Sequence, residues 1–163
     1  MHIDKGRITQ LLLQLLKQDV IGARKRLETV RRAMIEAPGA MQSHSDTTKY
    51  QMGLVADEMC RLIVSKEEAI TALDRLRISS EPSCRDTVTT GSLVEVETPE
   101  GERRGYLIFG KGGGSEVEYE GLRVLVVNPA APLGKALVGK CLGDIAEVNV
   151  GGLTRALVIC EIQ

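Results

Sequence analysis

Apolar residues recur every three or four positions through residues 1–78 of the chain. Such spacing places apolar side chains along one side of an α-helix. One series comprises Ile8, Leu12, Leu16, Val20, Ala23, Leu27, Val30 and Met34. A second comprises Met52, Val55, Met59, Leu62, Lys66, Ala69, Leu73 and Leu76. The pattern predicts two helices of about 30 residues, each about 45 Å long at about 1.5 Å per residue.

The two predicted helices are separated by a segment that lacks this spacing. Pro38-Gly39 indicates the end of the first helix, and the polar residues 42–48 indicate a turn. We therefore expect residues 1–78 to form an antiparallel coiled-coil hairpin with a projecting tip. Matching the apolar positions across the hairpin places Lys66 opposite Asp19, which predicts an ion pair. The alternative is that Lys66 only lays its aliphatic stem along the seam.

After the hairpin the chain changes character. Residues 79–90, which contain serines and a proline, form a predicted linker. Beyond it the apolar period becomes two, which is typical of strands. We expect five strands, at 93–96, 106–109, 124–127, 145–150 and 153–162, and a short helix at 132–138. The fold class is therefore α+β, with a small strand-rich domain at 91–163. The glycine-rich residues 110–115 are expected to be a flexible connection between strands.

Composition narrows the possible functions only a little. The formal net charge is −1, which names no partner, although residues 1–80 have a basic excess and residues 81–163 an acidic one. The four cysteines lack CxxC spacing, so we expect reduced thiols in the cytoplasm. No apolar run approaches the length of about 18 residues that a membrane span needs. Aromatic residues are too scarce to predict a base-stacking or isomerase pocket.

A run of motifs in the second half of the chain carries a resemblance. Pro132 begins the predicted short helix, Gly139-Lys140 ends it, and Gly143-Asp144 leads into a strand. The order of these motifs resembles the C-terminal domain of the bacterial Gre transcript-cleavage factors. Gly91-Ser92-Leu93-Val94, Gly101-Glu102 and Tyr106-Leu107-Ile108-Phe109-Gly110 are also similar to motifs of that family.

The resemblance implies a long hairpin followed by an FKBP-like domain. It implies binding to bacterial RNA polymerase, with the hairpin inserted into the secondary channel close to the 3′ end of the nascent RNA. The factor would modulate elongation or transcript cleavage without being an enzyme, because the polymerase performs any cleavage. In the family, two carboxylates at the tip help to hold Mg²⁺ at the polymerase active site. No cofactor is expected to be stably bound, and any Mg²⁺ would be shared with the polymerase.

The resemblance also nominates site residues. At the tip it places Asp46 on one carboxylate position and Ser43 on the other, although Asp46 is equally a candidate cap for the second helix. A basic patch facing RNA or polymerase comprises Arg24, Lys25, Arg26, Arg31 and Arg32, unless these residues simply form a solvated helix face. The docking region comprises Asn128, Pro129, Pro132, Lys135 and Lys140.

A second function from another class stays open at this point. The hairpin alone is compatible with a non-catalytic interaction or dimerisation module unrelated to transcription. We expect a monomer, because insertion into a channel needs the surface that dimerisation through the coiled coil would occupy. We also expect no binding to membranes.

Overall fold

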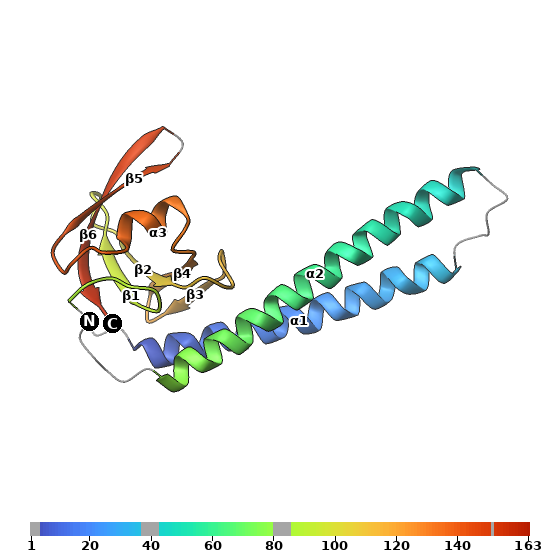
Figure 1. Ribbon diagram of the computed structural model, residues 1–163, viewed down its shortest axis with the longest axis horizontal. Coiled ribbons are helices and arrows are strands. Elements are labelled where there is room, and N and C mark those ends of the chain that lie inside the picture. Colours follow the sequence, from blue (N-terminus) through green and yellow to red (C-terminus); the bar gives the residue numbers. More distant parts are fainter. Residues whose placement is uncertain (1–3, 37–42, 80–85, 151) are drawn as a thin grey trace.

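The structure is a computed structural model that describes residues 4–36, 43–79, 86–150 and 152–163, with the side chains of 43–46, 77–79 and 150 excepted. A long helical hairpin projects from a sheet domain (Figure 1). The hairpin consists of α1 (Lys5–Glu36) and α2 (Ser43–Ser79). The amide of Lys5 donates to Oε1 of Gln163, so the start of α1 lies close to the last residue of the chain. The expected α+β arrangement is confirmed.

The first helix follows its predicted pattern. The Asp4 carboxylate accepts a hydrogen bond from the amide of Arg7 at 2.9 Å, which satisfies a free donor in the first turn. The first six members of the predicted apolar series, from Ile8 to Leu27, are buried. The sequence pattern therefore identified the packed side of α1 correctly.

The second helix differs from the prediction in where it begins. Residues 43–48, predicted as part of a turn, form the first turns of α2. Serine is favoured at a helix start, and an acidic residue such as Asp46 is favourable in the first turn, so the polar composition is compatible with a helix. Asp46 is the fourth residue of α2, so the alternative that it caps this helix, which the sequence had left open, does not hold.

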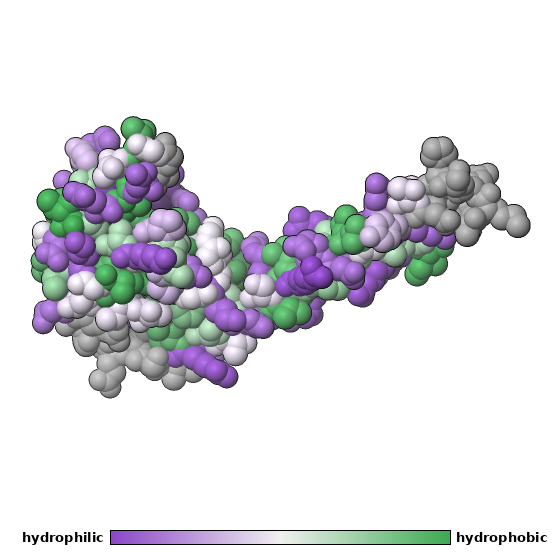
Figure 2. Space-filling model, turned by 45° about the horizontal axis from the view of Figure 1, so that its top comes forward, coloured by the Kyte–Doolittle hydropathy of each residue, from purple (hydrophilic) through white to green (hydrophobic). Residues whose placement is uncertain are grey.

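The packed side of α2 also differs from the prediction. Ala56 and Ile63 are buried, whereas Val55 and Leu62 are 48% and 45% exposed. The predicted and the observed series share Met52, Met59 and Lys66. Between these residues, the observed series has the residue that follows each predicted one in the sequence. Figure 2 shows the resulting surface, in which hydrophobic spots interrupt a hydrophilic hairpin. The side on which α1 lies decides which series is covered.

The predicted ion pair across the hairpin is confirmed. The ammonium group of Lys66 lies 2.6 Å from Oδ2 of Asp19, and both side chains are partly covered. We expect Lys66→Glu to lower the free energy of unfolding by about 1 kcal/mol, because it places two carboxylates together. The double variant Lys66→Glu/Asp19→Lys should recover most of this loss in urea unfolding. If the losses of the two single variants simply add in the double variant, the two groups do not interact.

The sheet has six strands where five were expected. They are β1 (Leu93–Glu97), β2 (Arg103–Ile108), β3 (Glu116–Tyr119), β4 (Leu122–Val127), β5 (Ile145–Val150) and β6 (Leu153–Ile162). Their order is β3-β4-β2-β1-β6-β5, and only the β2–β4 pair is parallel. β3 was missed because its four residues include a single aliphatic side chain, Val117. It forms an edge of the sheet.

Both faces of the sheet are covered. α3 (Pro132–Leu137) packs on one face, in a core with Val94, Ile108 and Leu157. The base of the hairpin packs on the other face, in a core that joins the two halves of the chain. That second core comprises Ile8, Leu12, Leu13, Leu16, Ala69, Leu73, Leu93, Leu107, Leu122, Val124 and Val126. The hairpin and the sheet domain therefore share a core.

Two connecting segments are more ordered than predicted. Val88, placed in the linker by the sequence, is fully buried, and its amide donates to the carbonyl oxygen of Lys140 at 2.8 Å. The predicted linker residues 80–85 lie outside the described residues. Residues 110–115, expected to be flexible, pack against the hairpin through Gly112. Because glycine has no side chain, it permits either a flexible backbone or close packing of the backbone against a neighbour. The sequence does not distinguish these two roles, whereas the fold does.

Candidate functional site

The tip of the hairpin holds the two positions nominated for metal chemistry. Ser43 and Asp46 are the first and fourth residues of α2, and their side chains lie outside the described part. Asp46 is the only acidic residue between residues 37 and 48. Mg²⁺ takes oxygen ligands, so the carboxylate of Asp46 is a suitable ligand, whereas Ser43 brings a hydroxyl without a charge. The described residues elsewhere contain no group of three metal-ligating side chains.

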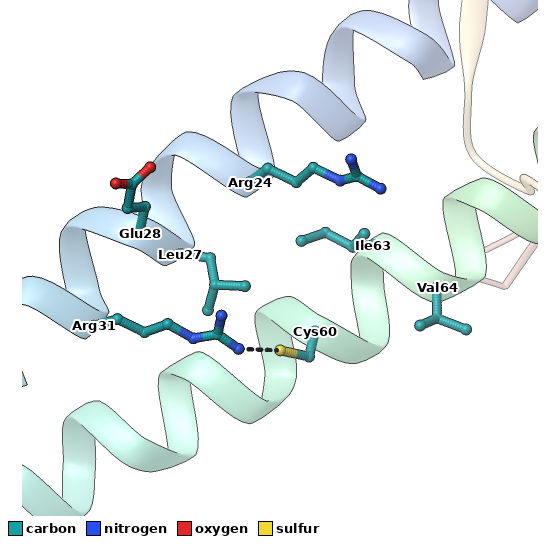
Figure 3. A pocket seen from close by; sticks show the side chains of 7 residues that line it. All are labelled: Arg24, Leu27, Glu28, Arg31, Cys60, Ile63 and Val64. Atoms are coloured by element: carbon teal, nitrogen blue, oxygen red, sulfur yellow. Dashed lines mark hydrogen bonds between the residues drawn. The ribbon is translucent and has the colours of Figure 1, made fainter.

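The basic patch is divided between different sides of α1. Successive helical residues are about 100° apart, so Arg24 and Arg31 share a side while Arg26 points the opposite way. Arg24 and Arg31 line a hollow of about 480 Å³ between the two helices (Figure 3). Nε of Arg26 instead donates to the carbonyl oxygen of Gly22 at 3.4 Å. The five cations do not form one surface.

Carboxylates neutralise part of the patch. Arg24 forms an ion pair with Glu67 of α2, and Arg32 pairs with Glu28 at 2.5 Å. Arg31 contacts the sulfur of Cys60 at 3.7 Å and has no acidic partner among the described side chains. Lys25 is exposed. Arg31 is therefore the arginine in the hollow that is available to an anionic partner.

The hollow contains residues that the sequence did not nominate. Leu27, Ile63 and Val64 supply apolar side chains to the hollow, and Cys60 lies beside Arg31 (Figure 3). The spacing of seven residues between Arg24 and Arg31 was a signal that they share a side. The contributions of α2 depend on the register of the hairpin, which a linear pattern does not show.

The predicted docking region forms the turn before α3 and the helix itself. Oδ1 of Asn128 accepts from the amide of Ala130 at 2.8 Å, and its carbonyl oxygen accepts from Ala131 at 2.9 Å. Pro132 then begins the helix. Gly139 ends it with a φ of +82°, as predicted, and donates to the carbonyl oxygen of Val88.

The side chains of this region differ in exposure. Asn128, Pro132 and Lys135 are exposed, whereas Pro129 and Lys140 are half-buried. α3 and the base of the hairpin cover opposite faces of the sheet. The structure therefore places the docking residues together and separates them from the tip by the length of the hairpin (Figure 1).

The aromatic residues do not converge on a pocket. Tyr106 belongs to the core beneath α3, whereas Phe109 and Tyr119 pack against the core at the hairpin base. Burial raises the pKa of the Tyr106 phenol above its usual value. These three side chains lie on opposite faces of the sheet, so they do not form an isomerase pocket. No helix of the described chain has the length and apolar character to cross a membrane.

Comparison with known proteins identifies one curated relative across most of the chain. Transcription elongation factor GreA of Phenylobacterium zucineum is 30% identical over an alignment of 148 residues that covers 85% of this chain and 87% of the relative. No family model matches.

Solved structures show a weaker likeness. Gfh1, a GreA factor homologue of Thermus thermophilus, is 21% identical over 93% of this chain and 94% of its own, with a TM-score of 0.39. A GreA/GreB factor of Nitrosomonas europaea is 23% identical over 56% of this chain and 78% of its own, with a TM-score of 0.36. The family assignment therefore rests on the curated relative.

Proposed function

Because the chain belongs to the GreA family of transcription elongation factors, we propose that it binds bacterial RNA polymerase and places its hairpin in the secondary channel. The observation that carries this proposal is the projecting hairpin (Figure 1). From Leu16, a core residue at its base, α1 continues for 20 residues to Glu36. At about 1.5 Å per residue this is a projection of about 30 Å. Such a length suits a tip that must reach a site deep inside its partner.

The sheet domain and the hairpin have different roles in this proposal. The turn and helix formed by Asn128 to Lys135 bind the outer surface of the polymerase. The hairpin presents Arg31 and Lys25 to acidic polymerase surface or to RNA phosphates. Asp46 lies at the tip, near the 3′ end of the RNA. The factor supplies no active site of its own, and any bond cleavage belongs to the polymerase.

The first experiment is binding of the full chain to core RNA polymerase, with GreA as the competitor. We expect saturable binding that GreA displaces. Binding that GreA does not displace would remove the secondary-channel proposal. Absence of binding at micromolar concentrations would favour the alternative, a hairpin that serves as an interaction or dimerisation module, and the mass in solution would then be the next measurement.

The tip carboxylate is tested by Asp46→Ala. We expect this variant to bind polymerase with unchanged affinity but to lose the effect of the factor on halted elongation complexes. Thr47→Ala is the matched control, because it alters the next residue without removing a charge. Equal activity of Asp46→Ala and the unmodified protein would show that the tip carboxylate has no role.

Ser43 offers a complementary test at the second tip position. Ser43→Asp supplies the carboxylate that family members have there, so we expect it to increase RNA cleavage by backtracked polymerase. Measured cleavage should rise only when polymerase is present. Cleavage that stays at the level of the unmodified protein would show that a second carboxylate is not what this tip lacks.

Arg31 is the test of the basic patch. Arg31→Glu is expected to weaken binding to the elongation complex about tenfold, which corresponds to about 1.4 kcal/mol, because it reverses a charge without breaking an ion pair to a described carboxylate. Arg26→Glu makes the same change on the opposite side of α1 and should have little effect. Equal losses in both variants would indicate a general effect of net charge, and no loss in either would remove the patch from the interface.

A further inference from the structure

The loop between β2 and β3 contacts the hairpin at the level of Leu16 on α1 and Ala69 on α2. A Cβ atom placed on Gly112 would lie 3.3 Å from Cβ of Ala69 and 3.8 Å from Cδ1 of Leu16. Ala69 and Leu16 are both fully buried. The backbone at Gly112 therefore lies against both helices, beside two side chains that water does not reach.

The same loop is firmly attached to the sheet. Phe109 donates its amide proton to the carbonyl oxygen of Val127, and Gly114 donates to that of Val126. Val126 in turn donates to Ser115 at 2.8 Å. These bonds join the loop to β4, which lies inside the sheet. Because the sheet holds the loop in place, the part of the hairpin that contacts the loop is held in a fixed position relative to the sheet.

An ion pair adds a polar contact at the same level of the hairpin. Lys111 pairs with Glu68, the residue next to Ala69. Two residues before Glu68, Lys66 pairs with Asp19 of α1. At this level each helix is therefore joined to the other, and α2 is also joined to the loop.

We propose that residues 110–115 act as a strut that sets the direction of the hairpin relative to the sheet domain. Gly112 and Lys111 are then positioning residues for the tip. The hairpin base alone gives one region of attachment, about which a helix pair is able to tilt. The loop contacts Leu16 and Ala69 at the distal end of that base, and a contact at this end resists the tilt. The consequence for polymerase rests on the proposed function, whereas the strut itself is a property of the free protein.

The length of the hairpin makes small tilts important. The tip lies about 30 Å beyond Leu16 at about 1.5 Å per residue, so a tilt of about 10° displaces it by about 5 Å. A shift of this size is larger than a hydrogen bond length, and it would remove Asp46 from contact with any fixed group in the polymerase. The accuracy of the tip therefore depends on contacts made far from it.

The test is the distance between spin labels at Asp57 on α2 and Glu147 on β5, both exposed positions. Labels carried by non-canonical amino acids leave the native cysteines in place. Gly112→Val adds a branched side chain against Ala69, at a φ of +70° that such residues rarely adopt. Gly113→Val is the matched control, because nothing lies within 4 Å of its Cβ position.

We expect Gly112→Val to shift the label distance by several ångströms or to double the width of its distribution. Gly113→Val should resemble the unmodified protein. An unchanged distance in Gly112→Val, or equal changes in both variants, would overturn the strut. If Gly112→Val does not fold, the decision passes to Lys111→Glu, which should broaden the distribution, and to Lys111→Glu/Glu68→Lys, which should narrow it again. No broadening in Lys111→Glu would then overturn the strut.

Polymerase binding separates this inference from the proposed function. A displaced tip with an intact sheet domain should bind core polymerase within about twofold of normal affinity and lose its effect on halted complexes. If the unmodified protein does not bind polymerase, the proposed function fails, but the label distances still decide whether the strut exists. Full activity of a Gly112→Val protein whose label distance has shifted would overturn the positioning role.

Discussion

Replacing Gly134 with alanine is expected to lower the free energy of unfolding by about 3 kcal/mol, the upper part of the range for overpacked sites. A Cβ atom at this position of α3 would lie 2.1 Å from the carbonyl oxygen of Asn128 and 2.8 Å from Cα of Pro129. Both are backbone atoms, so no side-chain rotation relieves the clash. The helix and the preceding turn must separate, and the core beneath α3 must open.

Chemical denaturation measures this loss, and Gly110→Ala is its control. Gly110 has open space at its Cβ position, so its replacement should change stability by less than about 1 kcal/mol. Because Gly134 supports the turn that contains Asn128, the variant that remains folded should also bind polymerase more weakly. Stability equal to that of Gly110→Ala would show that α3 does not approach the turn as closely as described.

Replacing Leu73 with alanine is expected to destabilise the whole protein by about 3 kcal/mol. Leu73 is fully buried in the core that α1, α2 and the sheet share. Removing three carbon atoms there leaves a cavity bounded by both halves of the chain. We therefore expect the hairpin and the sheet to lose stability together, in one unfolding transition.

Leu62→Ala is the control for this variant. It makes the same substitution in the same helix, but Leu62 is 45% exposed, so the loss should stay below about 1 kcal/mol. Helical circular dichroism should report the hairpin, and exchange of sheet amides should report the other half. Two separate transitions in the unmodified protein, or a Leu73→Ala effect limited to the helices, would contradict a shared core.

The ion pair between Asp19 and Lys66 shows that the sequence pattern alone can predict a contact between the two helices. It was predicted because an antiparallel hairpin has one register once its apolar positions are matched, and the structure confirms it. The same reasoning misjudged Val55 and Leu62, because two apolar series are available on α2. Periodicity narrows the packed side of a helix to neighbouring stripes, and the partner helix selects between them.

The candidate site was predicted unevenly for a similar reason. The short helix of the docking region depends on proline and glycine signals that act within a few residues, and these were identified, whereas the turn at Asn128 was not predicted. The basic patch was predicted as one group of five residues. The structure places Arg24 and Arg31 in a hollow and Arg26 on the other side of α1, because residues adjacent in sequence point in different directions on a helix.

By itself the sequence determined the two long helices, the strand-rich second half, the end of the short helix at Gly139, and a resemblance to the Gre family. These features depend on local backbone preferences and on periodic burial, which short segments encode. The tertiary structure alone decided that the halves share a core, that β3 completes the sheet and that Gly112 lies against Ala69. Such contacts join residues far apart in the chain, so their free energy depends on the arrangement of the whole fold.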